Sequence, residues 1–444
     1  MSSSSAQKGR RTMRGGILLK TALGMAALLA LAACGGSDEG GGSLNQGGQD
    51  PNAPVNTDPG TTSGGSSTPV KTPAQEQEEE VKKILDARKV DYGEALRTAS
   101  LKLVSELPTF DQIQRLATAS NEAAQKQVYE QEIDKMMADP RFEVRMIQWW
   151  RDTLATGGPS PRAGFPSYDT AATFAAQVVL EDRSYMELFT ASKGTCPTYR
   201  AGATATEKGV FTPADCTTGA NAAPTAGLLT DPGLLSQYYA NMAFRRVRIV
   251  QERFACSKFP AEFASNPTPM GAGTYTNPWP FDKLPDSKET DAAKKGAVNF
   301  QDTSAVICAN CHNTMNRMAP LFANYDDKGV YNATTIQVQT PVPGTPATRR
   351  VDWLKDGEPL AWRNGKTVTD IVSLGKAMVD DTDVQRCAVT RVFNFAMSKG
   401  DVVNDLATLP QVVTDPYLKS FKDGGFKLKP IIAQVFKSED FIKF

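Results

Sequence analysis

The stretch Cys308-Ala309-Asn310-Cys311-His312 places two cysteines three residues apart, with a histidine directly after the second. On an α-helix, residues at offsets of zero, three and four share one face, so both sulfurs and the imidazole are expected on the same side. This spacing is typical of covalent attachment of a c-type haem, in which the cysteines form thioether bonds to the porphyrin and the histidine is the proximal iron ligand. His312 is also the single histidine among the 444 residues. The stretch predicts one haem c held by Cys308, Cys311 and His312.

Two other interpretations of the same five residues remain open. A structural zinc site needs four cysteine or histidine ligands, and the remaining cysteines lie far from Cys308 and Cys311 in the sequence. A disulfide-bonded or redox-active Cys308–Cys311 pair explains the cysteines but leaves the adjacent His312 as a coincidence. The haem interpretation accounts for all three residues, and we prefer it.

The N-terminus has the features of an export signal. Residues 1–33 carry several basic residues, then an apolar run from Thr21 to Ala33 that is too short to span a bilayer. Leu31-Ala32-Ala33-Cys34 resembles the lipobox of bacterial lipoproteins, in which the cysteine becomes the lipid-modified first residue. Lipidation at Cys34 implies attachment to a membrane surface in the bacterial periplasm or at the cell surface. Gly35 follows the cysteine, and resemblance to the enterobacterial sorting rule then favours the outer membrane.

Residues 34–75 are rich in Gly, Ser, Thr, Pro and Asn and contain almost no apolar side chains. Such a segment cannot bury enough surface to offset the entropy of ordering, so we expect a disordered tether. The whole chain has 49 basic and 49 acidic residues, and removal of the leader with its five basic residues leaves 44 against 49. The mildly acidic remainder excludes a broad basic surface for nucleic acid.

The rest of the chain reads as mainly α, with several helices and one small β-hairpin insertion. We expect an N-terminal helical domain over 76–240 and a cytochrome-c-like haem domain over 241–444. Thr109 and Gln112 have capping-box spacing, and long helices are expected over 170–190 and 234–254. The attachment helix is expected over 294–311.

Three further patterns complete the predicted fold. Alternation within 334–353 predicts the β-hairpin, with Pro343-Gly344 at its turn. Trp149 and Trp150 lie in a helical apolar pattern, so we expect them in the core rather than at a cofactor. The last helix has a regular apolar stripe, made by Leu428, Ile431, Ile432, Val435 and Phe436.

The cysteine count agrees with an exported protein. Seven cysteines less Cys34 and the two of the haem motif leave four, and an even remainder outside the cytoplasm predicts two disulfides. Three pairings are possible from the sequence, and free buried thiols are the alternative. We favour Cys196–Cys216, which closes a local loop, and Cys256–Cys387, which joins the segment before the haem motif to a helix after it.

From Leu96 onward the chain resembles the planctomycete-type cytochrome-c-like proteins, a set of domains mostly of unknown function. The segments that carry this resemblance, in chain order, are Ala99-Ser100-Leu101, Leu107-Pro108-Thr109, Met137-Ala138-Asp139-Pro140-Arg141-Phe142, Glu181-Asp182-Arg183-Ser184-Tyr185, Ala226-Gly227-Leu228-Leu229-Thr230, Cys256, Cys308 to His312, Phe322 through Tyr331, Cys387 and Ser438-Glu439-Asp440-Phe441. The resemblance implies a helical haem protein and implies no substrate. The chain departs from the family pattern after Cys256 and after the helix that contains Cys387.

The iron chemistry depends on the sixth ligand. With no second histidine, that position is taken by methionine or another donor, or is vacant. Met378 lies well downstream of the motif, as the methionine of a cytochrome c does, although core packing is the commoner role of such a residue. We expect one-electron transfer with a redox partner protein or a periplasmic electron carrier. A haem enzyme or a gas- or peroxide-responsive protein with five-coordinate iron is the alternative, and a surface scaffold or binding lipoprotein is a third.

Overall fold

The computed structural model describes residues 79–80, 83–160, 162–216, 223–240, 243–258, 269–270, 273–274, 306–332, 337–338, 348–349, 354, 357–400 and 409–444. Within these ranges the protein is mainly helical, as predicted, and its strands form short two-stranded antiparallel pairs. The expected signal peptide, the lipidated Cys34 and the tether lie outside the described residues.

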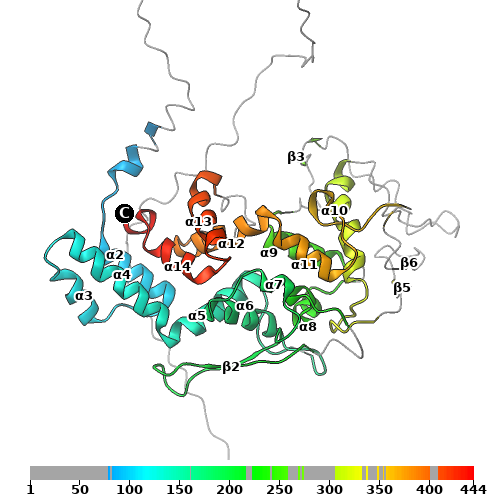
Figure 1. The fold of residues 1–444 in the computed structure, drawn as a ribbon, viewed down its shortest axis with the longest axis horizontal. Helices are drawn as coiled ribbons and strands as arrows, with labels where there is room; N and C mark the ends of the chain where they lie inside the picture. The colour runs from blue at the N-terminus through cyan, green and yellow to red at the C-terminus, as the bar shows by residue number, and fades with distance from the viewer. Residues whose placement is uncertain are drawn as a thin grey trace, which may run out of the picture. The chain divides into compact units, whose positions relative to one another are not determined.

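The first described helices have their starts encoded by local caps. They are α2 (Tyr92–Leu103), α3 (Phe110–Ala117), α4 (Glu122–Ala138) and α5 (Pro140–Leu154). The predicted capping box is confirmed: the Gln112 N–H donates to Oγ1 of Thr109, and the Thr109 N–H donates to Oε1 of Gln112. Asp139 caps α5, and Pro140 occupies its first turn, where no intrahelical N–H is needed. Helices α2 and α4 pack against each other (Figure 1).

The helix predicted over 170–190 is two helices, so that prediction is wrong. Helix α6 (Thr170–Leu180) ends where Asp182 adopts a left-handed φ of 55°, and α7 (Glu187–Thr190) follows. This turn lets the Arg183 N–H donate to the Val178 carbonyl and the Asp182 N–H to the Val179 carbonyl. Both bonds satisfy carbonyls at the end of α6 that lack intrahelical partners.

The helix predicted over 234–254 is also divided. The 3₁₀ turn η1 (Gly227–Thr230) leads into α8 (Pro232–Gln237), and α9 (Phe244–Phe254) starts after Ala243, whose φ is 57°. Between α7 and η1, a region without regular pattern in the sequence contains a short hairpin of β1 (Thr198–Arg200) and β2 (Val210–Thr212).

The predicted haem motif lies in α10 (Val306–Phe322), preceded by the short pair β3 (Pro269–Met270) and β4 (Gly273–Thr274). The predicted attachment helix therefore had the wrong end, because α10 continues well past Cys311. The small hairpin predicted over 334–353 is confirmed by β5 (Gln337–Val338) and β6 (Thr348–Arg349), paired antiparallel. The turn residues Pro343 and Gly344 lie outside the described ranges.

The remaining elements are η3 (Arg363–Gly365), α11 (Ile371–Val379), α12 (Thr382–Ala396), α13 (Gln411–Asp423), α14 (Leu428–Phe436) and α15 (Glu439–Ile442). All five residues of the stripe predicted for the last long helix are buried on α14. The chain end pairs with the start of the described fold, because Lys89 and Phe444 exchange two backbone hydrogen bonds of 2.9 Å. Tyr129 on α4 donates to the Phe436 carbonyl at 2.7 Å.

One hydrophobic core includes side chains from both sides of the domain boundary predicted at residue 240. Trp149 and Trp150 lie in this core as predicted, with Trp149 against Phe395 and Trp150 stacked on Tyr185. The N-terminal helices and the C-terminal helices α12 and α14 therefore stabilise one another. Among the described residues, no helix is both long and apolar enough to cross a membrane.

Candidate functional site

Helix α10 carries all three residues of the predicted haem motif. Cys308, Cys311 and His312 lie in its first half, so the expected offsets along one helix are present. The side chain of Cys308 lies outside the described part of the chain, whereas those of Cys311 and His312 are both half-buried. Further along the helix, Met315 and Phe322 are buried in the core. The motif therefore lies where α10 begins to emerge from the core.

The imidazole of His312 is held by a neighbour one turn away. Its Nδ1 lies 2.9 Å from Oδ1 of Asn316, a side chain that is only 4% exposed. A carboxamide oxygen only accepts, so in the neutral imidazole this bond has the proton on Nδ1 and the lone pair on Nε2. Phe244, the first residue of α9, contacts the imidazole edge to face at a centroid distance of 5.1 Å. These two contacts fix both the tautomer and the orientation of the ring.

This arrangement fits a c-type haem. A metal-bound histidine usually donates its second ring N–H to an acceptor that orients it, and Asn316 supplies that acceptor. The unprotonated Nε2 is the nitrogen that would ligate iron, and the two cysteines lie on the same helix within one turn. Asn316 and Phe244 were not identified from the sequence; an asparagine four residues after His312 on a helix was the available signal.

A buried arginine of α9, Arg246, is hydrogen-bonded to the C-terminal end of α10. Arg246 is 1% exposed, and its guanidinium donates to the carbonyls of Leu235 at 2.9 Å, Phe322 at 3.1 Å, Tyr325 at 2.7 Å and Asp326 at 2.6 Å. These four carbonyls belong to α8, to the last residue of α10 and to the loop that follows it, so the buried guanidinium joins three segments of the chain.

Met378, the candidate sixth ligand, is fully buried on α11. That helix packs against α7, η1 and α12, and Gly375 allows it to approach closely, since a Cβ there would meet the Phe189 carbonyl oxygen at 2.1 Å. The position is that of a core side chain.

Both disulfides favoured from the sequence are present. Cys256 is bonded to Cys387, which joins the end of α9 to α12. Arg391 strengthens the same junction by donating to the carbonyls of Arg253 at 2.9 Å and Glu252 at 3.1 Å. The segment before the haem motif is therefore fixed to a helix after it, as predicted.

The other disulfide, Cys196–Cys216, lies against a buried carboxyl group. Asp231 is fully buried, and one of its oxygens is 3.5 Å from Sγ of Cys196. The two sulfurs and this carboxylate form a cluster with the spacing of metal ligands. In the oxidised state the sulfurs are bonded to each other and offer no thiolate, so the cluster is not a metal site in this state.

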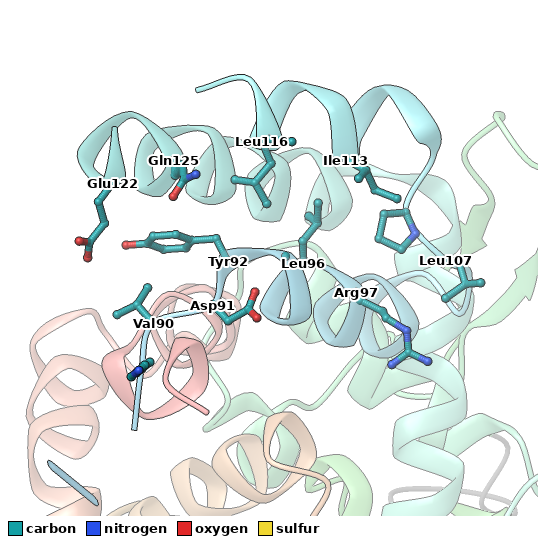
Figure 2. Close-up of a pocket in the computed structure, with 14 residues that line it drawn as sticks. Val90, Asp91, Tyr92, Leu96, Arg97, Leu107, Ile113, Leu116, Glu122 and Gln125 are labelled. Atoms are coloured by element: carbon teal, nitrogen blue, oxygen red, sulfur yellow. The ribbon is translucent and has the colours of Figure 1, made fainter. Parts of the chain in front are cut away.

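A separate cavity of about 880 Å³ lies among the N-terminal helices. Figure 2 shows Leu96 of α2 and Leu116 of α3 pointing toward one another across it, with Glu122 and Gln125 of α4 at one end. Its volume is in the range of small-molecule sites, but it contains no residue of the haem motif.

Comparison of the chain with known proteins assigns no family to it. No protein-family model, no curated protein and no solved structure matches the chain. The assignment of a function therefore depends on the chemistry of α10 and its neighbours.

Proposed function

We propose that the protein is a lipid-anchored c-type cytochrome of the bacterial periplasm or cell surface, favouring the outer membrane, that transfers single electrons to a redox partner protein. The observation that carries the proposal is the 2.9 Å bond between Nδ1 of His312 and Oδ1 of Asn316, on the helix that also contains both motif cysteines. A disulfide needs no oriented histidine, and a structural zinc site needs four cysteine or histidine ligands, whereas this stretch of the chain supplies three. A cytochrome-c-like haem domain in the C-terminal half is part of the same proposal.

Each residue has a separate role in this proposal. Cys308 and Cys311 form the thioether bonds, and Nε2 of His312 binds the iron. Asn316 accepts the Nδ1 proton and raises the basicity of the imidazole, while Phe244 restricts rotation of the ring. Bound haem c supplies reversible one-electron redox chemistry. The protein supplies the fixed ligand and a partly apolar surface from α9 and α10.

A second candidate is a haem enzyme or a gas- or peroxide-responsive protein with five-coordinate iron. Met378 favours it, because this methionine is fully buried on a helix that packs into the core. A vacant sixth position would then be open to a small ligand.

Intact mass of the mature protein tests haem attachment. The full chain is produced in a bacterial host that can attach c-type haem, and we expect the mass of the folded chain to increase by one haem. Cys308→Ser/Cys311→Ser should lose that mass. Cys196→Ser/Cys216→Ser is the matched control, because it removes the same number of cysteines and should retain it. A wild-type protein without added haem would refute the proposal.

Carbon monoxide binding to the ferrous protein separates the two functions. A spectrum that does not respond to carbon monoxide supports the electron carrier, and ready binding supports the five-coordinate alternative. Met378→Leu conserves volume and removes the sulfur, so it should leave the spectrum unchanged if Met378 is a core residue. If the variant alone gains carbon monoxide binding, Met378 is the sixth ligand.

Asn316→Leu tests the positioning of His312. Loss of the acceptor should make the imidazole a weaker donor and raise the midpoint potential of the haem, with the haem mass retained. Asn313→Leu is the control, because Asn313 is exposed on the same helix. Equal potentials in the two variants would show that Asn316 does not tune the ligand.

A further inference from the structure

The Cys196–Cys216 disulfide differs from the second disulfide in its surroundings. Both of its cysteines are half-buried, whereas in the other pair Cys256 is half-buried and Cys387 is only 2% exposed. Thr195, almost fully buried beside it, places its hydroxyl 3.2 Å from Sγ of Cys216, and Asp231 lies 3.5 Å from Sγ of Cys196. Each sulfur therefore has its own polar neighbour, a hydroxyl for one and a carboxyl for the other.

The two oxygens of Asp231 have different contacts, one with a helix start and one with the disulfide. Its Oδ1 accepts from the Leu234 N–H at 2.7 Å and caps α8, whereas the contact with Cys196 is made by Oδ2. Burial raises the pKa of Asp231 to about 6. A carboxyl group with such a pKa exchanges its proton near neutral pH.

We propose that Cys196–Cys216 is a thiol–disulfide exchange site, in which Cys216 is attacked by an external thiol and Asp231 carries the proton of Cys196. In reduction, the thiolate of an external dithiol bonds to Sγ of Cys216, the bond between the two cysteines breaks, and Cys196 leaves with the proton that Asp231 donates. The second thiol of the dithiol then displaces Cys216, which takes up a proton from solvent. Two electrons pass from the dithiol, which ends as a disulfide, to the protein, which ends with two thiols.

The neighbours of the two sulfurs decide this direction. Attack at Cys216 makes Cys196 the leaving group, and the protonated carboxyl group of Asp231, 3.5 Å away, can give it a proton. Attack at Cys196 would make Cys216 the leaving group, which has the Thr195 hydroxyl beside it instead of a carboxyl group. In the reverse direction the Asp231 carboxylate removes the proton from Cys196, whose thiolate then attacks the mixed disulfide at Cys216. The inference does not depend on the haem, because none of these residues belongs to α10.

The test measures exchange at each disulfide in the folded, full-length protein. Reduction by dithiothreitol at pH 7 is stopped by alkylation and read from peptide masses, and reclosure with oxidised glutathione is followed in the same way. Asp231→Asn keeps the cap, because asparagine caps helices as well as aspartate. We expect it to slow both reduction and reclosure about tenfold, since loss of a general acid or base commonly costs that much or more. Asp370→Asn is the matched control, because Asp370 also caps a helix, accepting from the Ser373 N–H in the first turn of α11, and both rates should be unchanged.

Two further measurements avoid reliance on that variant. In the wild type, Cys196–Cys216 should be reduced about tenfold faster than Cys256–Cys387. With oxidised glutathione, Cys196→Ser should form a mixed disulfide at Cys216 about tenfold faster than Cys216→Ser forms one at Cys196, because the Thr195 hydroxyl stabilises a thiolate at Cys216. The proposal is overturned if the wild-type order is reversed, if the two single cysteines react equally, or if Asp231→Asn changes reduction and reclosure in opposite directions.

Discussion

Replacement of Arg246 by methionine should destabilise the protein more than any exposed substitution on α9. The side chain is 1% exposed and donates four hydrogen bonds, to the carbonyls of residues 235, 322, 325 and 326. Methionine keeps most of the apolar length and removes every donor. All four carbonyls then lose the guanidinium as a hydrogen-bond donor.

The expected magnitude follows from those four bonds. A hydrogen bond to a charged group contributes roughly 1.5–3 kcal/mol, but the arginine also loses its desolvation cost on removal and the bonds are not additive. Removing one side of a buried charged network typically costs about 3–5 kcal/mol. We therefore expect Arg246→Met to lower the free energy of unfolding by about 4 kcal/mol.

Urea unfolding, followed by circular dichroism, measures this change, and Arg248→Met provides the control. Arg248 lies on the same helix, is half-exposed and pairs with Glu252 at 2.8 Å, so its loss should cost less than about 1 kcal/mol. Arg246→Lys should fall between the two, because lysine keeps the charge without the planar set of donors. A loss below about 1 kcal/mol for Arg246→Met would refute the assignment of this arginine as the link between α9 and the end of α10.

Three more predictions concern backbone, charge and covalent links. Gly329→Ala should lower the free energy of unfolding by several kcal/mol, because Gly329 has a φ of 69° and a Cβ there would meet Cα of Pro232 at 2.6 Å. Gly357→Ala, at a φ of 83° with open space around it, should lower it by only about 1 kcal/mol. Equal losses in the two variants would contradict the clash at Gly329. Burial raises the pKa of Asp231 to about 6, so folding favours its protonated form. Relative to Asp231→Asn, the wild type should be more stable below pH 4 and should lose about 3 kcal/mol of that advantage as the pH rises through 6. Parallel curves of unfolding free energy against pH for the two proteins would disprove this. Removal of Cys256–Cys387, which closes a loop of 131 residues, should destabilise the protein by about 5 kcal/mol. Removal of Cys196–Cys216, which closes a loop of 20 residues, should cost about 3 kcal/mol. Calorimetry of the two double alanine variants measures both losses, and the reverse order would contradict the prediction.

The sequence by itself determined those features that local chemistry controls. The Thr109–Gln112 capping box needs only neighbours three residues apart, and the stripe on α14 needs only helical periodicity. The helical fold class and the β-hairpin also followed from sequence pattern. The even cysteine count predicted two disulfides, and the structure selected one of the three possible pairings, the favoured one. The motif at Cys308–His312 is likewise written entirely in consecutive residues.

Only the tertiary structure decided where helices end and what the polar side chains contact. Asp182 and Ala243 break two expected helices by adopting positive φ, a conformation unfavourable for residues other than glycine that surrounding contacts must stabilise. Arg246 is buried because carbonyls nearly 80 residues away converge on it, and Asp231 meets Cys196 across 35 residues of sequence. These contacts join segments that are far apart in the sequence, and hydrophobic periodicity within one segment does not predict them. They form only when the tertiary fold brings the segments together.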